Sequence, residues 1–369
     1  MKKLILIFLV IFISCVNQSN ENDDEKNKII EDSSFMDGAD LSYVNEMEDC
    51  GATYKNLNNN FEDVFQIFKN SGAEIIRVRL WNNPKWTNYS NLNDVKKTIR
   101  RSKELGMKVL LDFHYSDTWA DPSKQIIPKD WENSIGDTIE LGNLLYSYTQ
   151  SVLKELVQEN LKPDIVQVGN EINIMLLQEE NKHSEKIDWN RNSYLINKGI
   201  SAIRDLNQEI EIMLHIAQPE NALWWFSEAS QNGIDNYDWI GISYYPKWSS
   251  VNLIDLDQSI KNLIESYNKK LIVVETAYPY TMKNIDNANN ILDENSLISG
   301  YPATIEGQHN YLIDLKNKII SGGGSGLIYW EPAWVSTNCK TLWGTGSHWE
   351  NATLFDLNNK AIEGISFMK

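Results

Sequence analysis

Short apolar segments recur along the chain from residue 35 onward, and most of them are continuously apolar rather than alternating with polar residues. Continuous runs of this kind are typical of parallel strands that are covered on both faces. The runs are Met36–Leu41, Ile75–Trp81, Lys108–His114, Ile165–Gly169, Ile210–Ile216, Trp239–Tyr244, Leu271–Glu275 and Gly326–Trp330. They predict about eight strands, the number that closes a parallel barrel.

Segments with helical periodicity separate these strands, and they include Glu62–Ser71, Leu92–Leu105, Leu141–Glu159, Trp189–Leu206 and Leu256–Tyr267. Regular alternation of strand and helix favours a closed (β/α)8 TIM barrel over an open doubly wound sheet. The first predicted strand also runs into G-A-D-L-S-Y, which lacks the G-x-G-x-x-G pattern of a dinucleotide-binding sheet. We therefore predict a single catalytic α/β barrel over residues 35–369.

The first 34 residues have a different character. Lys2 and Lys3 precede an apolar run, Leu4–Ile13, that is too short to span a bilayer and ends at Ser14-Cys15. The string F-I-S-C resembles a bacterial lipoprotein signal, which predicts a signal peptide over 1–14 and lipidation of Cys15. An ordinary signal peptide with an incidental cysteine is the alternative. Residues 15–34 are polar and acidic, so we expect a disordered tether and display on the outer face of the outer membrane.

Charge and composition narrow the class of partner. The chain has 51 acidic and 34 basic residues, a net charge of −17, which opposes binding to the phosphate backbone of nucleic acid. It also has 13 Trp and 16 Tyr, whose flat faces suit the C–H faces of sugars. We expect a monomer that binds a polysaccharide and contacts a membrane only through its lipid anchor.

Two glutamates end predicted strands. Glu171 closes the fourth apolar run in V-Q-V-G-N-E, and Glu275 closes the seventh in V-V-E-T-A-Y-P. The working residues of such barrels lie at the C-terminal ends of the strands, and strands four and seven form opposite walls. Two carboxylates about 5 Å apart are the acid/base and nucleophile of a retaining glycosidase. The pattern predicts Glu171 as acid/base and Glu275 as nucleophile.

Other polar residues at strand ends fit supporting roles. Asn170 is placed to bind a sugar 2-hydroxyl, and a strand cap is its alternative role. Arg77 is our choice, ahead of Arg79, to hold Glu275 ionised, because a buried arginine needs carboxylates beside it. His114 is placed to orient a carboxylate or to bind substrate. Tyr244 is the predicted donor to the nucleophile, with its neighbour Tyr245 as the competing choice.

Aromatic residues are frequent where the upper loops are predicted. Trp330, at the end of the last strand, is the expected floor for the sugar at the cleavage point. A larger set is expected to line an extended groove: Trp81, Tyr115, Trp119, Tyr278, Trp334, Trp343 and Trp349.

Several longer strings resemble those of the arabinogalactan endo-β-1,4-galactanases, glycoside hydrolase family 53. They are G-A-D-L-S, R-V-R-L-W-N-N-P, L-L-D-F-H-Y-S-D-T-W-A-D-P, V-Q-V-G-N-E-I-N, V-V-E-T-A-Y-P-Y and Y-W-E-P-A-W. The resemblance implies a (β/α)8 barrel that cleaves β-1,4-galactan internally with retention and needs no cofactor. It implies the same roles for Glu171 and Glu275, and it adds Asp40 and Asp112 as candidate substrate-binding residues.

The chain departs from this resemblance in two loops. Some bacterial relatives bind calcium after the seventh strand, and here Asn284, Asp286 and Asn290 keep oxygens at alternating positions while Ala288 does not. Because calcium takes six to eight oxygens, a structural calcium site here is expected to be weak. The loop from Lys182 to Asn192 is charged rather than aromatic, which is expected to change product length.

Three alternatives remain at this point. Another endo-glycanase on the same barrel, a mannanase or a xylanase, shares the two glutamates. A surface protein that captures glycan without cutting it is expected to lose one of them. A metal-dependent hydrolase needs clustered ligands, whereas the 5 histidines are dispersed. The sequence also leaves open whether Cys50 and Cys339 pair.

Overall fold

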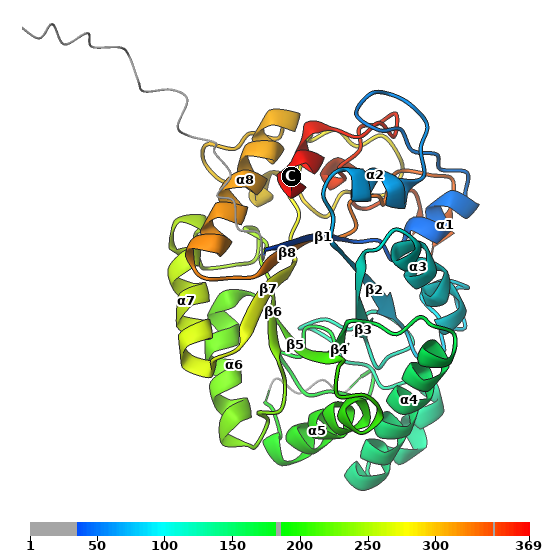
Figure 1. Ribbon diagram of the computed structural model, residues 1–369, viewed down its shortest axis with the longest axis vertical. Coiled ribbons are helices and arrows are strands. Elements are labelled where there is room, and N and C mark those ends of the chain that lie inside the picture. The colour runs from blue at the N-terminus through cyan, green and yellow to red at the C-terminus, as the bar shows by residue number, and fades with distance from the viewer. Residues whose placement is uncertain (1–34, 182–185, 342–343) are drawn as a thin grey trace, which may run out of the picture.

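A computed structural model describes residues 35–369 except 182–185 and 342–343. In these residues, parallel strands close into one barrel in the chain order β1 to β8, which confirms the predicted fold. Figure 1 shows the strands around a central axis with the helices outside them. The strands are β1 (Met36–Asp40), β2 (Ile75–Leu80), β3 (Lys108–Phe113), β4 (Ile165–Val168), β5 (Glu211–Ala217), β6 (Trp239–Ser243), β7 (Lys270–Glu275) and β8 (Gly326–Tyr329).

The longer helices connect successive strands and cover the barrel. The α-helices are α1 (Val44–Asp49), α2 (Val64–Asn70), α3 (Leu92–Glu104), α4 (Thr138–Gln158), α5 (Trp189–Leu206), α6 (Pro219–Gln231), α7 (Leu256–Tyr267) and α8 (Ile305–Ser321). Short 3-10 helices are η1 (Lys129–Ser134), η2 (Leu253–Asp255), η3 (Glu294–Ser296), η4 (Glu350–Ala352) and η5 (Glu363–Met368), and β9 (Lys340–Thr341) pairs with β10 (Gly344–Thr345). No helix among the described residues has the length and apolar character needed to cross a bilayer.

Side-chain caps define the starts of several helices. Asp63 accepts from the backbone N–H groups of Phe65 and Gln66 before α2, and Asp137 caps α4 in the same way. Such caps satisfy N–H groups that have no partner within the helix. They explain why α2 begins at Val64, two residues later than the hydrophobic periodicity indicated.

A disulfide joins Cys50, at the end of α1, to Cys339 in the segment after β8, with the two Cα atoms 5.6 Å apart. The bond settles the pairing that the sequence left open. It links two parts of the chain that are 289 residues apart in sequence.

Candidate active site

The interior of the barrel consists of an apolar lower layer and a polar upper layer. The lower layer is Met36, Ile75, Leu110, Ile165, Met213, Trp239, Ile272, Val274 and Ile328, all buried. Side chains two or four positions further along a strand point to the same face. On that face the strands carry Asp40, Arg77, Asp112, Gln167, His215 and Ser243. The apolar layer therefore supports a ring of polar groups at the C-terminal end of the barrel.

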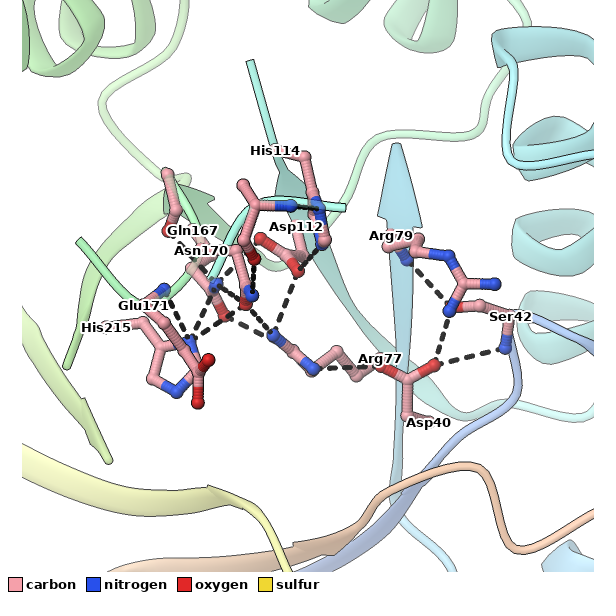
Figure 2. A network of polar contacts seen from close by, with 12 residues as sticks. Asp40, Ser42, Arg77, Arg79, Asp112, His114, Gln167, Asn170, Glu171 and His215 are labelled. Atoms are coloured by element: carbon pink, nitrogen blue, oxygen red, sulfur yellow. Dashed lines mark hydrogen bonds and ion pairs between the residues drawn. The ribbon is translucent and has the colours of Figure 1, made fainter. Parts of the chain in front are cut away.

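Arg77 lies at the centre of this ring and is 1% exposed. Its guanidinium forms ion pairs with Asp40 at 3.0 Å, Asp112 at 2.9 Å and Glu275 at 2.7 Å. It also donates to the side-chain oxygens of Gln167 and Asn170, so each of its five N–H groups has an acceptor. Figure 2 shows Arg77 between Asp40 on one side and Asp112 with Asn170 on the other.

Glu275 is the residue at the end of β7, where the strand pairing is irregular. A register shift between Ile242 and Ser243 pairs Ser243 with Glu275 instead of Val274. Val274 belongs to the apolar layer below, and the carboxylate of Glu275 reaches Arg77 above it. The hydroxyl of Tyr245 donates to Glu275 Oε2 at 3.3 Å.

The choice of Tyr244 as the donor to Glu275 is corrected by this geometry. The hydroxyl of Tyr244 instead donates to the backbone oxygen of Val251, on the outer side of the strand. The reason is strand parity: Trp239, Ser243 and Tyr245 share the inward face, and Tyr244 points the other way. Tyr245, the competing choice, lies in the site.

Glu171 follows β4 in a strained turn. Gly169 has φ +87°, a conformation that glycine adopts at little cost, and Glu171 itself has φ +44°. A non-glycine residue in this region costs about 1–3 kcal/mol and is held only by surrounding structure. The carboxylate is held by the hydroxyl of Ser243, which donates to Glu171 Oε1 at 2.6 Å.

The two glutamates differ in acidity. Burial raises the pKa of Glu275 to about 7, with Arg77 opposing that rise. Burial and the negative charge of Glu275 raise the pKa of Glu171 well above its usual range. Glu275 therefore loses its proton first, and Glu171 retains one while Glu275 is ionised. Carboxyls that differ in this way suit an acid and a nucleophile.

His114 lies beside the ring and fixes the carboxylate of Asp112. Its Nδ1 accepts from the backbone N–H of Ala120 at 3.2 Å, so its Nε2–H faces Asp112 Oδ2 at 3.1 Å. Asn170 is fixed in a similar way, because its Nδ2 donates to the backbone oxygen of Ala120. These two residues hold the groups that surround Arg77.

Asp40 and Asp112 do not form the surface of the cleft. Both are fully buried, and their oxygens accept from Arg77, Ser42, His114 and Gln167. Their expected role in substrate binding is therefore corrected to support of Arg77. The cause is their position in the polar layer beneath the loops.

A band of aromatic rings runs beside Glu275. Trp330 lies next to Trp119 (5.8 Å between ring centroids), Trp334 (6.2 Å) and Trp349 (4.7 Å). The band continues from Trp349 through Tyr245 to Trp248, which is 48% exposed. Trp119 and Trp330 are partly exposed, whereas Trp334 and Trp349 are buried. Trp81 packs behind Trp119 and is 1% exposed, which corrects its predicted place in the groove.

Two further aromatic residues predicted to line the groove are corrected. Tyr115 is buried against Phe113 and Tyr148, and its hydroxyl bonds to Thr149 on α4. Tyr278 stacks on Tyr311 of α8. Both rings lie between the barrel and its helices because of their strand-end parity, so neither lines the cleft. Trp343 lies outside the described residues.

Arg79 packs against the aromatic band, whereas the arginine that pairs with Glu275 is Arg77. It forms an ion pair with Glu331 at 2.6 Å, and its guanidinium lies over the rings of Tyr43, Trp81 and Trp119. Such cation–π contacts are strengthened by burial. Burial also raises the pKa of Glu331 to about 8.

Two of the three residues predicted for calcium, Asn284 and Asp286, use their side-chain oxygens in hydrogen bonds within the protein. Asp286 accepts from the backbone N–H groups of Ala288 and Ser347, both at 2.7 Å, and from the hydroxyl of Ser336 at 2.5 Å. Asn284 accepts from Asn290. Among the described residues no three His, Cys, Asp or Glu side chains gather as metal ligands. Asn290 Oδ1 and Glu350 Oε2 are buried without a hydrogen-bond partner.

Several functional residues were not predicted. Gln167, His215 and Ser243 belong to the polar layer, and Glu331 directly follows Trp330. The signal was present in the sequence: each of the first three lies two or four positions after an apolar interior residue on the same strand.

Known proteins resemble this chain over its whole length. The family model described as Glycosyl hydrolase family 53 matches residues 36–368. An arabinogalactan endo-beta-1,4-galactanase from Cellvibrio japonicus is 50% identical over 376 residues, covering 100% of this chain and 97% of the relative. An endo-beta-1,4-galactanase from Bacillus subtilis is 36% identical, covering 86% of this chain and 76% of the relative.

Among solved structures, the GH53 catalytic domain from Ignisphaera aggregans superposes with a TM-score of 0.84 and 32% identity. The match covers 91% of this chain and 96% of that domain. The family model, the relatives and the solved structure agree with one another, and the chain belongs to glycosyl hydrolase family 53.

Proposed function

We propose that the chain is an endo-acting, retaining glycoside hydrolase that cleaves β-1,4-galactan, as in type I arabinogalactan and pectin side chains, into galacto-oligosaccharides. One observation carries this proposal. Glu275 ends β7 and Glu171 follows β4 of the same barrel, and burial together with the charge of Glu275 raises the pKa of Glu171. The named activities of relatives that match 86% or more of the chain supply the substrate.

In the first step Glu275 attacks the anomeric carbon. Arg77 and Tyr245 hold its carboxylate and favour the ionised form. Glu171 gives its proton to the glycosidic oxygen as the bond from that oxygen to the anomeric carbon breaks. The products are a galactosyl ester on Glu275 and a free leaving chain.

In the second step Glu171, now ionised, takes a proton from water, and the water oxygen attacks the anomeric carbon. The bond to Glu275 breaks, which regenerates both carboxyl groups in their starting states. Two inversions give net retention. The reaction uses protein groups alone and needs no cofactor.

The test is product analysis on linear β-1,4-galactan with wild type, Glu171→Gln and Glu275→Gln. Wild type is expected to release short oligosaccharides with the β-anomer forming first in a proton NMR time course. Each variant is expected to lose about 10³-fold or more in kcat, because each removes a reacting group.

Glu363→Gln is a matched control, because Glu363 is exposed on the last 3-10 helix. It is expected to behave like wild type. Mannan and xylan serve as competing substrates. Cleavage of mannan or xylan in preference to galactan would contradict the substrate assignment. Binding of galactan without cleavage would instead support the alternative function, a surface protein that captures glycan without cutting it.

We also propose that the chain is exported and anchored through a lipid on Cys15, with the cleft outside the outer membrane. The support is the order of Lys2, Lys3, the apolar run, Ser14 and Cys15. Residues 1–34 lie outside the described part of the chain. A labelled fatty acid fed to producing cells is expected to enter wild type and not Cys15→Ala. Protease added to intact cells is expected to remove the enzyme.

A further inference from the structure

A hydrogen-bonded chain leads from Glu171 away from the cleft into the barrel wall. Ser243 Oγ donates to Glu171 Oε1 at 2.6 Å, and His215 Nε2 lies 2.9 Å from Ser243 Oγ. His215 and Ser243 are both 0% exposed. Substrate therefore cannot touch either residue, so any effect on catalysis acts through a neighbouring side chain. Ser243 reaches Glu171, and His215 contacts Ser243, Asn170 and Gln167.

The surroundings of His215 decide which of its nitrogens carries the proton. The backbone N–H of Glu171 points at Nδ1 from 3.4 Å. Gln167 Nε2 gives one hydrogen to Asp112 Oδ1 at 2.6 Å, and its second hydrogen is shared between Nδ1, at 3.1 Å, and Asn170 Oδ1, at 3.2 Å. Asn170 Oδ1, which lies 3.0 Å from Nδ1, already accepts from Arg77 at 2.7 Å. Nδ1 thus acts as an acceptor, and the proton of the neutral ring is on Nε2.

The charge state of the ring is consistent with this arrangement. Burial, Arg77 and His114 lower the pKa of His215 well below its ordinary value, so the ring stays neutral while the enzyme works. With its proton on Nε2, the ring donates to Ser243 Oγ. The hydroxyl hydrogen of Ser243 is then free to point only toward Glu171.

We propose that His215 and Ser243 are positioning residues that keep Ser243 donating to Oε1 of Glu171 in both protonation states, so that the acid proton stays on Oε2. This inference rests on the proposed function, because it assigns the proton-carrying atom of the acid. During glycosidic cleavage the Oε2–H bond breaks and the proton joins the leaving oxygen. No proton moves along His215 and Ser243.

The tautomer of His215 can be measured without activity. In protein labelled with ¹⁵N-histidine, the ring shifts distinguish protonated Nε2 from protonated Nδ1, and His215→Gln identifies the His215 signals. The expected result is a neutral ring protonated on Nε2 and unchanged from pH 5 to 8. A ring protonated on Nδ1 would overturn the proposal.

Kinetics test the effect on the acid. A dinitrophenyl β-galactobioside has a leaving group that needs no proton, whereas galactan needs one. Ser243→Ala is expected to lower kcat/KM for galactan about 10–100-fold and to change that for the dinitrophenyl substrate less than about threefold. Ser102→Ala is the control, because Ser102 is buried but bonds only to Thr98 on α3.

The pH profile gives a second readout. Loss of the hydroxyl bond to ionised Glu171 raises its pKa, so the basic limb for galactan moves to higher pH in Ser243→Ala. The charged and titratable groups facing this pair, Arg77, His114, Asp121, Tyr245 and Glu275, are unchanged in the variant.

The ring itself is tested with amides. His215→Gln retains an N–H near the Nε2 position and is expected to stay within about fivefold of wild type, while His215→Asn places its amide near Nδ1 and is expected to behave like Ser243→Ala. Equal losses of kcat/KM on galactan and on the dinitrophenyl substrate, or an unmoved basic limb in Ser243→Ala, would mean that His215 and Ser243 have only a structural role. Failure of wild type to cut galactan would instead refute the proposed function and leave the tautomer result standing.

Discussion

Tyr245 and Tyr244 are adjacent tyrosines with opposite orientations, which makes them a matched pair for mutation. Tyr245→Phe removes the donor to Glu275 Oε2. Since that bond favours the ionised nucleophile, kcat/KM is expected to fall about tenfold. The acidic limb of the pH profile is expected to move to higher pH.

Tyr244→Phe is the control for that prediction. It removes a hydrogen bond to the backbone of Val251, at a cost of about 1 kcal/mol in the free energy of unfolding. Its kcat/KM is expected to equal that of wild type. Equal loss of activity in Tyr245→Phe and Tyr244→Phe would mean that the bond from the Tyr245 hydroxyl to Glu275 has no particular role in the reaction.

The pKa values of the two glutamates predict the pH profile of wild type. Activity needs Glu275 ionised, so kcat/KM is expected to rise with pH through about 7, the pKa of Glu275. It then falls where Glu171 loses its proton, at a pKa well above the usual carboxyl range. A profile of kcat/KM on galactan measures both limbs.

Arg77→Lys tests the acidic limb. Lysine keeps the charge but lacks the planar fork that reaches five acceptors, so Glu275 becomes harder to ionise. The acidic limb is expected to move to higher pH and kcat to fall by at least about tenfold. Arg100→Lys, at a half-exposed arginine on α3, is expected to change neither. An unmoved acidic limb in Arg77→Lys would show that Arg77 does not tune Glu275.

At the scale of elements, the segments after β7 and β8 are joined through Glu350. Its Oε1 accepts from the backbone N–H of Ile285 at 2.6 Å, and burial raises its pKa to about 7. The folded protein therefore binds this proton more tightly than the unfolded chain between the ordinary carboxyl pKa and pH 7. The free energy of unfolding should decrease as pH rises through that window.

Glu350→Gln removes this pH dependence while keeping an oxygen for Ile285. The variant is expected to be more stable than wild type at pH 8, by about 1–3 kcal/mol, with the advantage shrinking toward pH 4.5. Thermal unfolding at both pH values measures it, with Glu363→Gln as the exposed control.

The same unfolding experiment addresses calcium. Because Asp286 is engaged by Ala288, Ser336 and Ser347, a chelator is expected to leave the melting temperature of wild type unchanged. A drop in melting temperature with chelator, reversed by calcium, would contradict this reading of the loop.

The sequence predicted those features of the fold and the site that depend on residues close together in the chain, and it predicted less well those that depend on contacts between distant segments. Apolar runs and helical periodicity are local, and they predicted every strand of the barrel and five of its helices, but not α1, α6 or α8. Glu171, Glu275 and Arg77 were found because a charge that ends an apolar strand is unusual. Tyr245 was ranked second because the sequence alone does not show that Trp239 is the interior residue from which the alternation along β6 is counted.

His215, Ser243 and Glu331 were missed for a related reason. Each looks like an ordinary strand or loop residue until the barrel closes and places it beside Glu171 or Arg79. Asp40 and Asp112 were found, but their depth below the cleft depends on the loops above them. Sequence patterns indicate the face of a strand better than the distance of a side chain from solvent.

At the scale of the whole molecule, the disulfide between Cys50 and Cys339 closes almost the entire barrel. Crosslinks across long loops restrict the unfolded chain, typically by about 2–4 kcal/mol. Replacing both cysteines by alanine is expected to lower the melting temperature by about 5–10 °C.

Reduction provides the control for the disulfide. Dithiothreitol is expected to lower the melting temperature of wild type to that of the double variant and to leave the double variant unchanged. If reduction leaves the melting temperature of wild type unchanged, the disulfide does not contribute to the stability of the barrel.

The direction of the strands has a consequence for how the enzyme meets its polymer. β1 begins at Met36 on the face opposite the polar layer, and both glutamates stand at the far ends of their strands. Galactan is therefore expected to approach the two glutamates from the end of the barrel opposite the start of β1. Under the lipid anchor that we propose at Cys15, the membrane is attached through the N-terminal side of β1, which is the end of the barrel that the polymer does not enter.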